Sequence, residues 1–252
     1  MNRIRKRDLI KTLFRTFYIQ GTWNYERMLG LGLCFCMIPV ARRICRDQEE
    51  LKHFLYRHLD FFNAHPYMAS YALGALTRLE EQSIFQKWDD KRPITIFKER
   101  ICGPLGAIGD ALFWQFVKPF SAIIGVIMSL MFGFVGVIFF LVIFNIPHIY
   151  FRINGIFKGY FKGFDIIRDL SISGTRKYFS RLNSIMSIFL GILTVITGYW
   201  IYIEGHGKTG IFVYVPMVFL SAGLAYGKKL SMIMIMVIMI SISILIGLMI
   251  QQ

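Results

Sequence analysis

The longest uncharged stretch of the chain, residues 119–151, contains no Asp, Glu, Lys or Arg. A helix needs about 20 mostly apolar residues to cross the hydrocarbon core of a bilayer. This stretch therefore predicts an integral membrane protein rather than a soluble domain. It can form one long span or a hairpin that bends near Gly133 and Gly136. Because basic residues flank both of its ends, the positive-inside rule places both ends in the cytoplasm and favours the hairpin.

The composition of the 252-residue chain agrees with a membrane location. Charged residues make up 17% of the chain, whereas a typical soluble domain has about 25%. The formal net charge of +14 would suggest nucleic-acid binding in a soluble protein. Here Lys and Arg flank the apolar runs, which is the pattern that membrane topology and anionic lipid explain. The sequence therefore predicts contact with membrane lipid and no nucleic-acid partner.

The distribution of charge divides the chain into two regions, residues 1–118 and residues 119–252. In the second region, we expect the hairpin at 119–151 to be followed by a basic cytoplasmic loop at 152–181. Three further membrane spans are predicted at residues 182–203, 211–227 and 230–250. This arrangement places the N-terminus in the cytoplasm and the C-terminus on the periplasmic or extracellular side.

The first region mixes short apolar runs with charged residues, and none of its runs comfortably reaches the length of a span. Short segments broken by Gly and Pro suit re-entrant or discontinuous helices that are packed inside protein. The predicted fold is therefore an all-α integral membrane protein. Its discontinuous helices lie in the N-terminal half and its transmembrane helices in the C-terminal half.

The sequence gives no sign of a metal site, a cofactor or an independent catalytic centre. The four cysteines include no CxxC pair and suit small buried side chains. Residues 207–209, GKT, resemble the end of a phosphate-binding loop, but Tyr202 stands where that motif needs a glycine. No nucleophile–base pair is recognisable. We therefore expect no cofactor, no metal and no catalytic residue.

A polar and aromatic cluster, QGTWNYERM at residues 20–28, stands directly before an apolar run. An indole ring packs against the C–H faces of a sugar, while amides and carboxylates bind its hydroxyls. The residues by themselves favour a plainer alternative, an aromatic anchor at the membrane interface with Arg27 reaching the headgroups. The candidates for a sugar-binding or translocation path in this cluster are Gln20, Trp23, Asn24 and Glu26.

Two further groups of polar residues border apolar runs. Pro66 disfavours helical geometry at His65, so Asn63 and His65 are expected near a helix end with free side chains. Glu80 and Glu81 close the next apolar run and could bind sugar hydroxyls. The ordinary alternatives are a structural or solvated histidine and a solvated helix end.

Asp110 ends the motif GPLGAIGD at residues 103–110. An ionisable group at bilayer depth costs about 3 kcal/mol or more, which makes it a functional candidate. Alternatively, Asp110 caps the helix formed by the residues that follow, and both roles can hold together. The three glycines of the motif, spaced three apart, suit close helix packing or access for a ligand.

Taken in order, these segments resemble the IID membrane component of the mannose/fructose/sorbose family of the bacterial phosphoenolpyruvate-dependent sugar phosphotransferase system. The resemblance is dense over residues 10–170 and extends to the end by hydropathy only. The matching motifs are QGTWNYERM (20–28), MIP (37–39), RHLDFFNAHPY (57–67), LEEQ (79–82), GPLGAIGD (103–110), FW (113–114), KP (118–119), GYFKG (159–163) and DIIRDL (165–170).

The resemblance implies a transport role in the bacterial plasma (inner) membrane. Family members pair with a IIC subunit to form the unit that translocates a hexose, and such pairs assemble as trimers. Cytosolic IIA and IIB units carry the phosphate on histidine. This chain would then be a non-catalytic part of a sugar-phosphorylating complex, and its polar candidates would lie on the translocation path or at an interface.

The chain departs from the family pattern at two places. Ala111 stands where relatives usually have proline, and the short segment 204–210 replaces a longer one before the final spans. The second departure motivates an alternative, an orphan IID-like membrane protein with a structural or regulatory role and no transport. Side-chain spacing does not identify the sugar.

Overall fold

The computed structural model describes residues 3–170 and, beyond them, five single positions between residues 182 and 196. Apart from those five positions, the predicted spans at 182–203, 211–227 and 230–250 lie outside the described residues. Within the described residues every named element is a helix, which confirms the predicted all-α class. The elements are α1 (Lys6–Arg15), η1 (Thr16–Tyr18), α2 (Gly30–Ile44), α3 (Gln48–Leu59), α4 (Ala69–Phe85), α5 (Arg92–Gly109), η2 (Asp110–Val117), α6 (Lys118–Phe132), α7 (Val135–Lys162), η3 (Gly163–Asp165) and α8 (Ile166–Asp169).

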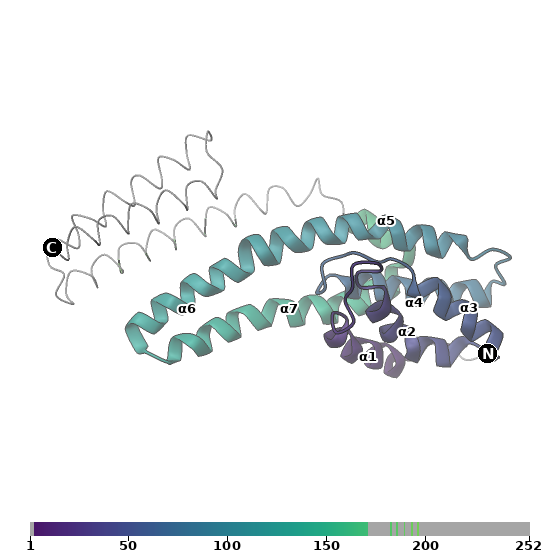
Figure 1. Ribbon diagram of the computed structural model, residues 1–252, viewed down its shortest axis with the longest axis horizontal. Coiled ribbons are helices and arrows are strands. Elements are labelled where there is room, and N and C mark those ends of the chain that lie inside the picture. Colours follow the sequence, from purple (N-terminus) through teal and green to yellow (C-terminus); the bar gives the residue numbers. More distant parts are fainter. Residues whose placement is uncertain are drawn as a thin grey trace, which may run out of the picture. The chain divides into compact units, whose positions relative to one another are not determined.

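Two long helical runs form a hairpin (Figure 1). The first run combines α5, the π-helical segment η2 and α6 without a break, and α7 returns beside α6. The turn between them contains Gly133, whose φ of +61° is readily adopted only by glycine. Residue 118, the boundary between the two regions in the sequence analysis, lies inside the first run and not at a break in the chain.

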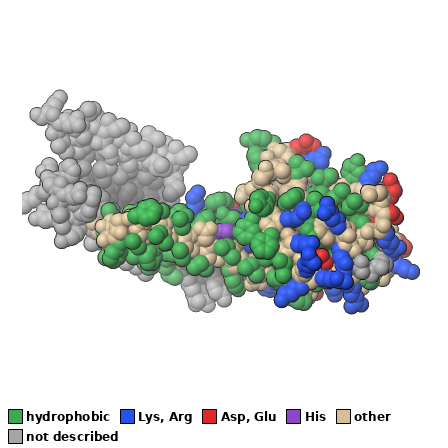
Figure 2. Space-filling model, turned by 90° about the horizontal axis from the view of Figure 1, so that it is seen from below, with side chains coloured by type: hydrophobic (Ala, Val, Ile, Leu, Met, Phe, Trp, Pro, Cys, Tyr) green, Lys and Arg blue, Asp and Glu red, His purple; other side chains and the backbone are tan. Residues whose placement is uncertain are grey.

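Both runs are long and apolar enough to cross a membrane. The first has 41 residues, and at 1.5 Å per residue it is about 60 Å long. Because the hydrocarbon core of a bilayer is about 30 Å thick, only part of this run fits inside it. Near the turn, large apolar side chains are exposed; Phe134, for example, is 77% exposed. In Figure 2 hydrophobic side chains cover the hairpin near its turn. Lys and Arg gather at the opposite end of the region formed by residues 3–170.

The shorter helices α1 to α4 cluster around the end of α7 that is distant from the turn (Figure 1). Helices α2, α3 and α4 have 15, 12 and 17 residues, respectively, so each is shorter than a typical membrane span. Helix α4 is almost entirely buried and packs along α7. Glycines permit this packing, because a Cβ atom on Gly74 would lie 2.2 Å from the carbonyl oxygen of Ile156.

Local sequence signals explain the bounds of α3. Asp47 precedes the helix, and its carboxylate accepts the backbone N–H of Glu50 at 2.8 Å. Acidic residues occupy the first turn, and Arg57 and His58 occupy the last, as the helix dipole favours. The chain then forms a loop that contains Pro66 before α4 begins at Ala69. This loop carries Asn63 and His65 toward α5.

Candidate functional site

A cavity of about 390 Å³ lies where the loop before α2, the loop between α3 and α4, and the α5–η2 run meet. This volume falls within the range of small-molecule sites. Four of the predicted residues that line it have exposed side chains, whereas His65 is buried. The cavity is therefore open at the surface of this chain. The predicted residues that line it are Gln20, Trp23, Asn63, His65 and Asp110.

His65 forms the buried wall of the cavity, and a stacking contact and a hydrogen bond hold its ring in place. It stacks on Phe113 with the ring centroids 4.9 Å apart, and its Nδ1 accepts the backbone N–H of Tyr67 at 3.3 Å. Burial, with a smaller contribution from the charge of Arg152, lowers the pKa of His65 to about 4. His65 is therefore neutral near pH 7, with its remaining proton on Nε2, which has no hydrogen-bond partner among the described residues.

The three glycines of the motif GPLGAIGD have different structural roles. A Cβ atom on Gly109 would lie 2.2 Å from the Cβ atom of His65, so only glycine lets the two segments approach. By contrast, a Cβ atom added to Gly103 or Gly106 would meet no other atom within 4 Å, so these two glycines leave the wall of the cavity open. The close-packing role suggested by the sequence therefore applies to Gly109, and the other two glycines provide space.

Asp110 does not cap a helix. The backbone continues from α5 into η2 with helical geometry, and the carboxylate makes no capping hydrogen bond. The capping alternative is therefore wrong, because the helical backbone runs through this residue and leaves no free helix end to cap. Instead Asp110 is the first residue of a π-helical segment, a distortion that occurs frequently at functional sites. Its exposed side chain lines the cavity.

The structure does not bring Asn24 and Glu26 into the lining of this cavity. The side-chain oxygen of Asn24 accepts the backbone N–H of Arg27 at 2.8 Å and closes a local turn. The exposed carboxylate of Glu26 lies 3.4 Å from the Nε of Arg27. Both side chains serve the loop that carries Gln20 and Trp23, so they shape the cavity only indirectly.

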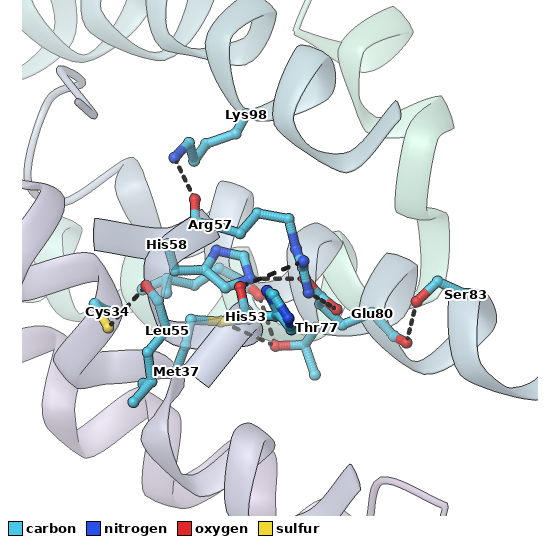
Figure 3. A network of polar contacts seen from close by, with 11 residues as sticks. Cys34, Met37, His53, Leu55, Arg57, His58, Thr77, Glu80, Ser83 and Lys98 are labelled. Carbon is cyan, nitrogen blue, oxygen red and sulfur yellow. Dashed lines mark hydrogen bonds and ion pairs between the residues drawn. The ribbon is translucent and has the colours of Figure 1, made fainter. Parts of the chain in front are cut away.

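Glu80 lies at the centre of a buried polar network (Figure 3). Its carboxylate accepts two hydrogen bonds from Arg57, from Nε at 2.8 Å and from Nη2 at 3.0 Å. It also accepts one from Nε2 of His58 at 2.9 Å. The ammonium of Lys98 donates to the carbonyl oxygen of Arg57 at 2.7 Å. This network joins α3, α4 and α5, and Glu80 is not part of the cavity.

The charges of this network follow from its contacts. Burial by itself would raise the pKa of Glu80, but its hydrogen bonds to His58 and Arg57 and the charge of Arg57 outweigh burial and lower the pKa to about 2. Burial lowers the pKa of His58, which we therefore assign as neutral with its proton on Nε2. The core of the network is thus one carboxylate paired with one guanidinium, with a neutral histidine as an additional donor.

The lowered pKa of Glu80 predicts a pH dependence of stability. Its pKa falls from an ordinary value of 4.5 to about 2 in the folded protein. The stabilisation by this carboxylate is therefore complete above about pH 4.5 and is lost as the pH falls toward 2. We expect the difference in unfolding midpoint between the wild type and Glu80→Gln to shrink over this range. A difference that stays constant from pH 7 to pH 2.5, measured by circular dichroism in detergent, would contradict the prediction.

Glu81 fastens the N-terminal segment to α4 and α7. One carboxylate oxygen accepts the backbone N–H of Ile4 at 2.8 Å, and the other accepts the hydroxyl of Tyr160 at 2.6 Å. Arg78 lies 3.0 Å from the second oxygen. Glu81 is 4% exposed, so the sequence-based alternative of a solvated helix end is wrong. Glu81 therefore holds the N-terminal segment in place, and neither Glu80 nor Glu81 lines the cavity of His65 and Asp110.

Several polar and charged residues that the fold buries wholly or in part were not recognisable from the sequence. Arg57, His58 and Lys98 complete the Glu80 network, and their spacing along the chain gave no signal. Arg152 was assigned to a cytoplasmic loop, yet it is 4% exposed on α7 and lies over the rings of Phe17 and Tyr67. Its position directly after a long uncharged run was the available clue. Among residues 3–170 no group of His, Cys, Asp and Glu could hold a metal ion.

Comparisons of this chain with a family model and with individual known proteins all indicate the same family. A model of the mannose/fructose/sorbose family IID component of the phosphotransferase system matches residues 3–207. The mannose-specific IID component of Escherichia coli K12 is 32% identical over 203 residues, which cover 80% of this chain and 71% of that protein. The sorbose-specific IID component of Lacticaseibacillus casei is 31% identical, covering 76% and 68%, respectively. The fructose permease IID component of Bacillus subtilis is 28% identical, covering 67% and 62%.

Solved structures agree with the sequence relatives. A chain in the cryo-EM structure of the mannose transporter ManYZ in complex with microcin E492 matches with a TM-score of 0.63 and 32% identity. The match covers 77% of this chain and 71% of that chain. The fold, the motifs and the relatives therefore agree with the resemblance found in the sequence. The chain belongs to the IID components of the mannose/fructose/sorbose family, which are membrane components of phosphotransferase-system sugar transporters.

Proposed function

We propose that the cavity lined by Gln20, Trp23, Asn63, His65 and Asp110 is part of the path that a hexose takes through the transporter. The observation that carries this proposal is their convergence, because three separate segments of the chain bring five candidate side chains to one cavity. The cavity is open, so a second subunit can complete it. We assign that role to a IIC subunit, since the matching structure is that of the two-component transporter ManYZ.

The chemistry of the cavity suits a neutral polyhydroxylated ligand. Asp110 accepts hydrogen bonds from hydroxyls, while the amides of Asn63 and Gln20 both donate and accept. The indole ring of Trp23, 47% exposed, offers a flat apolar face to the C–H groups of a sugar ring. The neutral His65 adds a buried polar wall without a competing positive charge. We assign phosphoryl transfer to the cytosolic IIA and IIB units, so this chain contributes translocation and assembly.

The same proposal includes an arrangement in the membrane. The apolar hairpin enters the hydrocarbon core, and the basic surface of the helix cluster faces the cytoplasm, in agreement with the positive-inside rule. The short helices α2 and α4 act as discontinuous helices that neighbouring protein shelters from lipid. The N-terminus then lies in the cytoplasm of a bacterial cell and the C-terminus outside the plasma membrane. Pairs of IIC and IID assemble into trimers.

Uptake of labelled hexose tests the proposed path. Cells that express this chain with its IIC, IIA and IIB partners are compared with cells that carry Asp110→Asn or Asn63→Ala. Replacing the charged acceptor of Asp110 with the neutral amide of Asp110→Asn predicts about a 10- to 100-fold slower uptake. Loss of a neutral hydrogen bond predicts about a 3- to 10-fold slower uptake for Asn63→Ala. The matched control is Asp89→Asn, an exposed carboxylate outside the cavity.

The proposed path requires that both variants still co-purify with IIC in normal amounts. If the wild type takes up hexose and both variants take it up at the same rate, the cavity is not on the path. Co-purification of the wild type with IIC but no uptake of any hexose would instead favour the orphan role, in which the IID scaffold assembles without transport.

A further inference from the structure

A second cavity, of about 430 Å³, forms a groove between α1 and α2 on the helix cluster. None of the candidate transport residues lines it. Four of its eight lining residues are cationic, and one is acidic, so the groove carries a net positive charge. The cationic residues are Lys11, Arg15, Arg42 and Arg43.

Two of these cations are already engaged within the protein. The Nε of Arg43 lies 3.7 Å from the carboxylate of Asp8 and donates to the carbonyl oxygen of Arg3 at 3.2 Å. Arg15 donates to the carbonyl oxygen of Phe35 at 2.9 Å and lies over its ring. These contacts hold the guanidinium groups of Arg15 on α1 and Arg43 on α2 in fixed positions.

The other two cations, Lys11 and Arg42, are exposed, and no hydrogen bond or ion pair joins either of them to another described residue. One comes from α1 and the other from α2, so the pair brackets the groove. Two available cations beside two fixed ones form a receptor for a group with concentrated negative charge, such as a phosphate. The charge of Asp8 is partly offset by Arg43, whose Nε lies 3.7 Å from its carboxylate.

The remaining lining of the groove is apolar, and it distinguishes a lipid from a soluble anion. Phe14 is 65% exposed, and Ile38 is partly buried beside it. A cationic rim next to an exposed aromatic side chain is the pattern of a helix that lies at a membrane surface. A soluble phosphate would gain nothing from Phe14, whereas the glycerol backbone and first acyl carbons of a phospholipid would cover it.

From this combination of charge and apolar surface we propose that the α1–α2 groove binds the headgroup of an anionic phospholipid. Lys11 and Arg42 contact the phosphate, Arg15 and Arg43 supply the surrounding positive field, and Phe14 packs against the upper part of the acyl chain. The bound lipid fixes α1 to the membrane surface. This site is independent of the proposed sugar path, because the two cavities share no lining residue.

Native mass spectrometry of the detergent-purified full chain, titrated with phosphatidylglycerol or phosphatidylcholine, tests the proposal. Each cation near an anionic lipid surface contributes about a fivefold change in affinity, so the double variant Lys11→Gln/Arg42→Gln is expected to bind phosphatidylglycerol about 25-fold more weakly. The matched control, Lys87→Gln/Arg100→Gln, removes one exposed Lys and one exposed Arg outside the groove and should bind as the wild type does. A third variant, Phe14→Gln, should weaken phosphatidylglycerol binding while keeping all four cations.

Several results would overturn the proposal. One is equal loss of affinity in the groove variant and in its control, which would indicate a diffuse charge effect. Another is equal binding of phosphatidylcholine by the wild type. A third is full competition by glycerol 3-phosphate together with no effect of Phe14→Gln, which would identify the groove as a site for a soluble phosphate. Circular dichroism of each variant establishes that a loss of binding does not come from unfolding.

Discussion

Replacing Glu80 with alanine is expected to destabilise the helix cluster by about 3–5 kcal/mol, because the change leaves a half-buried guanidinium and a fully buried imidazole without their shared partner. Arg57 would lose both of its hydrogen bonds to the carboxylate, and the Nε2 of His58 would lose its acceptor. Water cannot readily replace the carboxylate, since Glu80 is fully buried. Unfolding in mixed micelles of a mild detergent and sodium dodecyl sulfate, followed by circular dichroism, measures the loss.

The matched control for this prediction is Glu99→Ala. Glu99 is exposed on α5, so its removal is expected to change stability little. A double-mutant cycle with Arg57→Ala then separates the pair from the rest of the network, and the second substitution should cost much less once the first is present. Similar losses for Glu80→Ala and Glu99→Ala would refute the structural role of the network.

The packing of α4 on α7 leads to the second large effect. A Cβ atom on Gly159 would lie 2.3 Å from the carbonyl oxygen of Tyr71 and 2.9 Å from the backbone nitrogen of Ala75. These are backbone atoms within a helix, so a rotamer change cannot relieve the clash. We expect Gly159→Ala to destabilise the protein by about 3 kcal/mol, at the upper end of typical overpacking costs. The same micelle unfolding experiment measures it.

Gly103→Ala is the matched control, because it makes the same substitution but is expected to change stability in the opposite direction. No atom lies within 4 Å of the Cβ position at Gly103. Alanine in a helix is more favourable than glycine by about 0.5–1 kcal/mol, so this substitution should stabilise the isolated chain slightly. If both alanine variants changed stability by the same amount and in the same direction, the close approach of α4 and α7 would not be the feature that requires glycine.

The Glu80 network also bears on the cavity that we propose for transport. The Glu80 network fixes α3 to α4 and α5, and the loop between α3 and α4 carries Asn63 and His65. Loss of the network is therefore expected to disturb the cavity through the position of that loop and not through any contact with a sugar. A Glu80 variant that assembles normally but transports poorly should regain activity when the fold is stabilised by a substitution that does not line the cavity.

The class of the protein could be predicted from the sequence because it depends on local patterns. The uncharged run at residues 119–151 exceeds the length that a membrane span needs, and charged residues flank it on both sides. The all-helical class and the family follow from such runs and from short motifs that occur in a characteristic order along the chain. The polar residues at 63, 65 and 110 could be selected because polar side chains in apolar surroundings are costly.

Only the tertiary structure separated the candidates by role. Glu80 and Asp110 looked alike in the sequence, as carboxylates beside apolar runs. The partners of Glu80 lie 22 and 23 residues earlier in the chain, and they make it a buried structural group, whereas Asp110 has an open cavity beside it. In the same way Gly103 and Gly109 share one motif, yet only Gly109 has a neighbour close enough to require glycine.

The sequence by itself thus determined which segments are helical and apolar, and which polar side chains are unusual for their surroundings. Both properties depend on residues that are close in the chain. Which side chains meet, which cations remain unpaired and which glycines are in contact were decided by the packing of α3, α4, α5 and α7. Such contacts join residues far apart in sequence, and a change of a few ångströms in helix position turns a binding group into a structural one.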